Sequence, residues 1–182
     1  MDIRPSSFVY HSNDIKKCID FLQDINQLIM AEGRKPWLGE GMYFWDNQSN
    51  AKFWLERKKK ESKSDANVCV IKGMIYTDND LDLTDSEVAD YVYNLWKKYL
   101  ETIGKMNNET NTLGSILDIL FEYFDLYNYY NIIKVHGKYN APTFGIFNSV
   151  NYRKLPKPTY DTKCIYNVKK SEAFVKDSFE IT

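Results

Sequence analysis

Residues 37–45 read WLGEGMYFW, a stretch that joins a glycine turn to three consecutive aromatic side chains. Gly39 and Gly41 allow the backbone to turn sharply or to approach a ligand closely, because glycine has no Cβ. Side chains alternate along a strand, so Tyr43 and Trp45 are expected to share one face. One face must belong to the core, and the other offers flat rings for a ligand. We therefore place one wall of a candidate pocket here, with a plain core strand as the alternative interpretation.

A second candidate element is the pair Tyr10-His11, at the end of a short predicted strand. Behind it, apolar residues recur at the spacing of an amphipathic helix over residues 15–29. Ser12 or Asn13 is predicted to cap this helix. A side chain at such a junction points into a cleft beside free amides, although a lone histidine can equally be a structural hydrogen-bond partner.

The rest of the chain carries further helix and strand patterns. We predict helices at residues 47–60, 88–103 and 116–124, and strands at residues 68–76, 132–135, 144–150 and 163–168. Thr84 and Glu87 are expected to form a capping box in front of the second of these helices. Because strands gather late in the chain after two helices, the predicted fold class is α+β.

Composition limits the class of protein. The chain of 182 residues predicts one domain over residues 1–182, with 43% hydrophobic and 27% charged residues, as in folded globular proteins. A net charge of −1 argues against strong bulk attraction to nucleic acid. The three cysteines fit neither a disulfide framework nor a zinc site. With no signal-peptide core and no apolar run long enough to span a bilayer, we expect a cytoplasmic protein without membrane contact.

Together, Tyr10-His11 and the run at residues 37–45, followed by Ala51 on the next helix, resemble the ADP-ribosyltransferase superfamily. The closest likeness is to its His–Tyr–acid branch, which includes diphtheria toxin and the poly(ADP-ribose) polymerases. The run WLGEGMYFW is similar to that of small bacterial ADP-ribosyltransferase-like proteins, some linked to toxin–antitoxin and phage-defence loci. The resemblance implies an ADP-ribosyltransferase-like split β-sheet core flanked by helices. It also implies a mono-ADP-ribosyltransferase that takes ADP-ribose from NAD and releases nicotinamide.

The same resemblance implies roles for single residues. Tyr43 would be a catalytic residue whose ring packs against the nicotinamide, and His11 would hydrogen-bond the adenosine-side ribose. The backbone of Ser12 would hold the nicotinamide amide, and Gly41 and Trp54 would complete the cofactor-binding set. NAD would be consumed as a substrate, and no metal would be required.

The third corner of the family's triad is a Glu or Gln near the start of a late strand. Aligning residues 164–167 puts Thr162 at that position with Asp161 beside it, so these two residues are the main catalytic candidates, and Glu172 and Glu180 are more remote ones. A hydroxyl cannot stabilise developing positive charge as a carboxylate does, and Asn50 stands where the family has Arg. A second interpretation is therefore a non-catalytic NAD- or nucleotide-binding pseudoenzyme, or a phage or plasmid accessory protein of the same fold. The resemblance implies as partners a protein or nucleic-acid target and an antitoxin or inhibitor protein.

Overall fold

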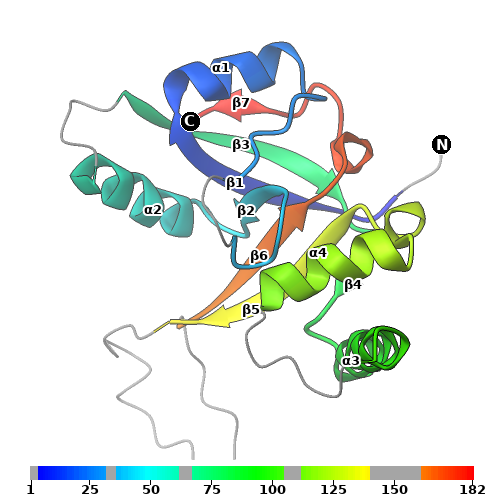
Figure 1. The fold of residues 1–182 in the computed structure, drawn as a ribbon. Helices are drawn as coiled ribbons and strands as arrows, with labels where there is room; N and C mark the ends of the chain where they lie inside the picture. Colours follow the sequence, from blue (N-terminus) through cyan, green and yellow to red (C-terminus); the bar gives the residue numbers. More distant parts are fainter. Residues whose placement is uncertain (1–3, 32–35, 62–66, 105–111, 140–160) are drawn as a thin grey trace, which may run out of the picture.

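The computed structural model describes residues 4–31, 36–61, 67–104, 112–139 and 161–182 (Figure 1). Its elements in chain order are β1 (Ser6–Asp14), α1 (Ile15–Gln23), β2 (Met42–Trp45), α2 (Gln48–Glu61), β3 (Val68–Tyr76), β4 (Asp80–Asp82), α3 (Ser86–Thr102), α4 (Leu113–Tyr123), η1 (Leu126–Asn128), β5 (Ile132–Lys138), β6 (Thr162–Val168), η3 (Ser171–Ala173) and β7 (Glu180–Ile181). In these ranges the strands form one seven-stranded mixed sheet flanked by helices, which confirms the α+β class.

The sheet has the strand order β4-β5-β6-β2-β1-β3-β7. β4 and β5 are parallel, and the other neighbouring strands are antiparallel. β1 and β3 pair along their whole lengths, from Ser6↔Tyr76 to Asp14↔Val68. β1 and β2, in contrast, are joined only at Tyr10↔Trp45. The sheet is continuous, but in the described parts of the chain its two halves meet at this single backbone pair, which we call the seam.

Two hydrophobic cores lie on opposite faces of the sheet. One lies beneath α3 and α4 and contains Trp96, Leu117 and Phe121. The other lies beneath α1 and the C-terminal segment, where the rings of Phe21 and Phe44 each pack edge-on against Phe174. Figure 1 shows α1 and β7 on one side of the molecule and α3 and α4 on the other. The seam lies between these two layers.

The predicted cap of α1 is wrong. Ser12 and Asn13 belong to β1, which continues its pairing with β3 as far as Asp14. The Asp14 carboxylate is the cap, because it accepts hydrogen bonds from the backbone N–H groups of Lys16 and Lys17 at 2.9 and 3.4 Å. The helix therefore begins only where the sheet pairing stops.

The capping box predicted at Thr84 and Glu87 is also wrong. The Thr84 hydroxyl donates to the Asp82 carboxylate at 2.6 Å, and Asp85 caps α3 by accepting from the Glu87 backbone N–H at 2.8 Å. α1 is shorter than predicted and ends at Gln23, although apolar residues beyond it still pack against the core beneath α1.

The strand predicted at residues 68–76 is confirmed as β3, and the one at residues 163–168 as β6. The strand predicted at residues 144–150 lies outside the described residues. β4 and β7 were not predicted, because strands of three and two residues carry too little pattern to be recognised. Within the described ranges, no helix combines the length and apolar character needed to cross a membrane.

Candidate functional site

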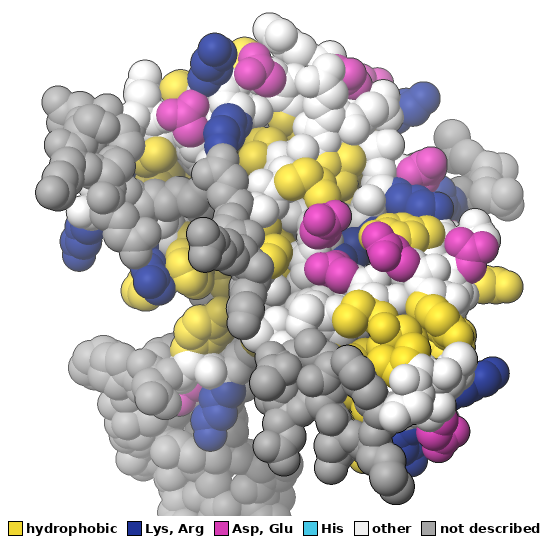
Figure 2. Space-filling view, viewed as in Figure 1, with side chains coloured by type: hydrophobic (Ala, Val, Ile, Leu, Met, Phe, Trp, Pro, Cys, Tyr) yellow, Lys and Arg dark blue, Asp and Glu magenta, His cyan; other side chains and the backbone are white. Residues whose placement is uncertain are grey.

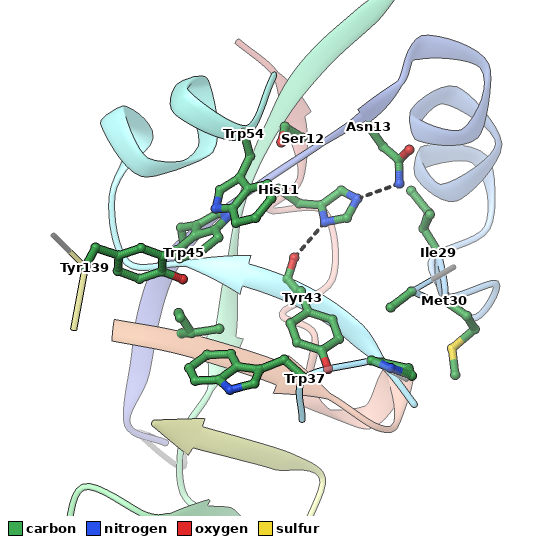
Figure 3. Close-up of a pocket in the computed structure, with 13 residues that line it drawn as sticks. His11, Ser12, Asn13, Ile29, Met30, Trp37, Tyr43, Trp45, Trp54 and Tyr139 are labelled. Carbon is green, nitrogen blue, oxygen red and sulfur yellow. Dashed lines mark hydrogen bonds between the residues drawn. The ribbon is translucent and has the colours of Figure 1, made fainter. Parts of the chain in front are cut away.

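A cavity of about 360 Å³ lies beside the seam, where β1 and β2 diverge (Figure 3). Its polar wall comes from the end of β1 and consists of His11, Ser12 and Asn13. Its aromatic wall comes from four segments of the chain and consists of Trp37, Tyr43, Trp45, Trp54 and Tyr139. The described lining contains no Asp or Glu, so the cavity suits a flat ligand with hydrogen-bonding groups on one edge.

His11 bridges the two strands where their backbones no longer pair. Its Nδ1 lies 2.6 Å from the carbonyl oxygen of Tyr43, and its Nε2 lies 3.2 Å from the side-chain nitrogen of Asn13. Its ring also lies 5.5 Å from that of Phe44, centroid to centroid. His11 is 7% exposed, so these contacts hold a nearly buried imidazole at the cavity wall.

Tyr43 places its ring in the cavity wall and its hydroxyl in the preceding loop (Figure 3). The hydroxyl accepts from the Leu38 backbone N–H at 2.7 Å and donates to the Gly39 carbonyl at 2.9 Å. Burial raises the pKa of Tyr43 to about 12, while the Leu38 amide offsets part of this shift. Tyr43 is therefore a neutral hydroxyl at physiological pH that anchors the loop, and its ring is the part available to a ligand.

The aromatic wall is built around two stacked indoles. The rings of Trp45 and Trp54 are nearly parallel, 18° apart, with centroids 5.8 Å from each other. Tyr139 meets Trp45 at 63°, and the Arg57 guanidinium lies 5.0 Å from the Trp54 ring centroid. α2 thus contributes both a flat surface and a positive charge close to the cavity.

The loop before β2 is held from β6 by Asn167, which has no exposed surface. Its side-chain nitrogen donates to the carbonyls of Leu38 and Gly39 at 2.8 and 3.2 Å. Gly41 has a φ of 142°, and a Cβ there would lie 1.7 Å from the Asn167 side-chain oxygen. Glycine at this position is therefore required by packing against Asn167, not by contact with a ligand.

Lys169 holds the same loop through its buried ammonium group. The Nζ atom donates to the Glu40 carbonyl and lies 3.2 Å from the Asp118 carboxylate, which also accepts from the Glu40 backbone N–H at 2.9 Å. Burial lowers the pKa of Lys169, and Asp118 opposes this shift. Burial raises the pKa of Tyr127, and the carboxylates of Asp118, Glu40 and Glu122 raise it further. Figure 2 shows acidic side chains gathered over α4 on this face.

The main candidates for the third corner of the triad lie at the start of β6, away from the described cavity lining. The Asp161 carbonyl accepts from the backbone N–H of Tyr139, a cavity residue, at 2.8 Å. Asp161 directly precedes β6, and alternation continued one residue beyond the strand would put it on the face of Ile165, which lines the cavity. Thr162 is exposed and lies on the opposite face, so Asp161 is the better placed of the two.

The structure thus brings together part of the site predicted from sequence. The predicted residues that line the cavity are His11, Ser12, Tyr43 and Trp54. The predicted residues that are not among its described lining are Gly41, Asp161 and Thr162. Tyr10 packs against the core beneath α3 and α4. The supporting residues that sequence reasoning missed are Asp118, Asn167 and Lys169, because only the folded chain brings them to the loop. Asn13 is predicted as a helix cap, and its contact with His11, two residues away on β1, follows from its place in the strand.

No group of three or more His, Cys, Asp or Glu side chains in the described part of the chain is arranged to hold a metal ion. The described cysteines, Cys18, Cys69 and Cys164, are free thiols. The described cavity lining offers aromatic rings for stacking and the polar side chains of His11, Ser12 and Asn13.

Comparison with known proteins gives one weak relative. The chain is 24% identical over 120 residues to an uncharacterized protein of Methanocaldococcus jannaschii. The match covers 63% of this chain and 56% of that protein, so the chain spans little more than half of its relative's length. No family model matches the chain, and no solved structure matches it.

Proposed function

We propose that this protein is a mono-ADP-ribosyltransferase that binds NAD in the cavity beside the seam. The observation that supports this proposal is the convergence of His11, Tyr43 and Trp54 on a single cavity. These residues come from β1, β2 and α2, and each is a position at which the resemblance to the His–Tyr–acid branch implies contact with NAD.

The size and chemistry of the cavity suit one half of NAD. About 360 Å³ lies near the lower end of the roughly 300–1,000 Å³ found for ligand pockets. Nicotinamide would pack on the Tyr43 ring, and a ribose hydroxyl would reach His11. The diphosphate would extend from the cavity towards Arg57, whose guanidinium lies against Trp54. The other nucleoside would then lie outside the cavity.

The reaction breaks the bond between the nicotinamide nitrogen and C1′ of its ribose. The bonding electron pair leaves with nicotinamide, and an acceptor nucleophile forms the new bond to C1′ and loses its proton. A carboxylate stabilises the positive charge that develops on the ribose and polarises the nucleophile. We assign this role to Asp161, because it directly precedes β6 and its backbone carbonyl is hydrogen-bonded to the cavity residue Tyr139.

A second candidate function is binding of NAD or another nucleotide without catalysis. The observation that favours it is the lack of Asp and Glu among the described cavity-lining residues. In this case the site would serve as a sensor or as part of an accessory protein, and bound NAD would remain intact.

The test uses NAD labelled in its adenylate phosphate, incubated with the protein and a cell lysate that is then separated into protein, DNA and RNA. Transfer predicts label in one fraction together with free nicotinamide. Binding that raises the melting temperature without nicotinamide release supports the second candidate. Absence of NAD binding refutes the transferase, and absence of a melting-temperature shift with ATP, GTP and FAD as well refutes the second candidate. Trp54→Ala should abolish binding, whereas Phe53→Ala is the matched control on the same helix, because Phe53 is 62% exposed.

A further inference from the structure

The contacts of His11 define which of its ring nitrogens carries the proton. Nδ1 lies 2.6 Å from the Tyr43 carbonyl oxygen, and a carbonyl oxygen can only accept a hydrogen bond. Nδ1 must therefore donate. A neutral imidazole has one N–H, so Nε2 carries the lone pair and is an acceptor.

The side chain of Asn13 independently requires the same arrangement. Its oxygen accepts from the Asp14 backbone N–H at 2.9 Å, which orients the amide and directs its nitrogen towards His11. That nitrogen can only donate, and it lies 3.2 Å from Nε2. From Asp14 through Asn13 and His11 to Tyr43, each contact pairs one donor with one acceptor.

We propose that this relay fixes His11 as the Nδ1–H tautomer, so that the site presents Nε2 to its ligand as a hydrogen-bond acceptor. In the ligand-free protein Asn13 is a positioning residue, and its amide occupies the place that a ligand hydroxyl takes; the Tyr43 carbonyl holds Nδ1–H in both states. Nε2 has a single lone pair, so the hydroxyl replaces the Asn13 amide. Both His11 and Asn13 line the cavity, so the exchange takes place at its wall (Figure 3).

The consequence is a rule of specificity. A ligand group facing Nε2 must be a donor, such as a ribose hydroxyl, whereas an ether, fluorine or phosphate oxygen finds no proton there. Identifying the donor as a hydroxyl of NAD rests on the proposed function. The tautomer itself does not, because it follows from contacts within the protein. Loss of one such hydrogen bond is expected to weaken binding about tenfold.

The first experiment measures the tautomer by long-range ¹H–¹⁵N NMR on the ligand-free protein at neutral pH. The chain has two histidines, His11 and His136, and His136 is exposed. The variant His136→Gln removes the signals of His136, so the histidine signals that remain belong to His11. Nδ1 of His11 should appear protonated and Nε2 unprotonated. An Nε2–H tautomer, or a fast mixture of the two, overturns the proposal.

The variant Asn13→Asp tests the role of Asn13. It places an acceptor opposite Nε2, so the Nε2 shift should move to that of a protonated nitrogen. A role of Asn13 in stability alone would change the melting temperature and leave this shift in place, which would overturn the positioning role.

The second experiment measures binding of NAD analogues in which one ribose hydroxyl at a time is replaced by fluorine, which cannot donate. One analogue should bind about tenfold more weakly than NAD, and the others should bind like NAD. Equal binding of NAD and all the analogues overturns the rule of specificity. If NAD itself does not bind, the proposed function fails. The NMR measurement still tests whether His11 is the Nδ1–H tautomer, because it needs no ligand.

Discussion

Replacing Tyr43 with Phe removes one oxygen atom, and that oxygen makes two hydrogen bonds within the loop that precedes β2. Leu38, whose backbone N–H donates to this oxygen, has no exposed surface. In the variant this donor is buried without an acceptor. The Gly39 carbonyl, in contrast, keeps the bond that Asn167 donates at 3.2 Å. The main cost therefore falls on Leu38.

A buried donor left without a partner costs roughly 1–3 kcal/mol. Taking the middle of this range, we expect Tyr43→Phe to lower the free energy of unfolding by about 2 kcal/mol. For a protein of this size, that loss corresponds to a fall of about 4–8 °C in melting temperature. The aromatic ring is unchanged, so the folded variant should bind NAD within about threefold of wild type, a difference of less than 1 kcal/mol.

Urea unfolding at 25 °C and calorimetry measure the stability, and titration with NAD measures the binding. Tyr93→Phe is the control, because Tyr93 is 58% exposed and loses little with its hydroxyl. A destabilisation no greater than that of the control would refute the reasoning that the hydroxyl anchors the loop. A loss of NAD affinity as large as that of Trp54→Ala would show that the hydroxyl itself contacts the ligand.

The pKa of Tyr43 is about 12 in the folded protein, above its unfolded value of roughly 10. Its hydroxyl therefore contributes fully to stability below pH 10 and loses this contribution as pH rises towards 12. Urea unfolding at several pH values should show the free energies of unfolding of wild type and Tyr43→Phe converging over this range. Gly41→Ala should fail to fold or lose several kcal/mol, at least about 3, because its Cβ would overlap the Asn167 side chain, as thermal melting can measure. Lys169→Met should lower the free energy of unfolding by about 2–3 kcal/mol, because it leaves the Glu40 carbonyl and Asp118 without their buried cation. Asp161→Asn should abolish nicotinamide release and leave NAD binding within about twofold, well under 1 kcal/mol. The control for Gly41→Ala is Gly104→Ala, because Gly104 also has a positive φ but an added Cβ would have no atom within 4 Å. The controls for Lys169→Met and Asp161→Asn are Lys176→Met and Asp20→Asn, at exposed positions. Effects equal to those of the controls would contradict each prediction.

Local patterns predicted the elements that are held by their own hydrophobic periodicity. β3 was found from its nearly continuous apolar residues, because they are buried against both cores. The caps failed for a different reason. Ser12 and Asn13 have typical capping side chains, but β3 pairs with this segment and extends β1 through both of them. A sequence pattern does not include a neighbouring strand, so it could not show that Asp14 would be the cap.

The candidate site divides in the same way. Tyr43 and His11 were singled out because aromatic and histidine side chains are conspicuous at a turn and at a strand end. Asn167 and Lys169 have no such local signal, since their role depends on pairing between β2 and β6 that brings them beneath the loop. The resemblance aligns residues 164–167 but implies no structural or catalytic role for Asn167. Its role in holding the loop follows from the structure, in which its side-chain nitrogen donates to the carbonyls of Leu38 and Gly39.

The seam gives the sheet a mechanical weak point. Among the described residues, the hydrogen-bonded connection within the sheet between the β4-β5-β6-β2 half and the β1-β3-β7 half is one ladder pair and the His11 bridge, whereas β1 and β3 share nine paired positions. The two hydrophobic cores add side-chain packing across the seam. Amide hydrogens of β2 near the seam should therefore exchange with solvent faster than those of β3, because opening there disrupts few bonds. A molecule held by His11 on one side and Tyr43 on the other would act as a clamp across the two halves. Binding would then slow the exchange of backbone amide hydrogens in both halves of the sheet, including amides far from any atom that the ligand contacts.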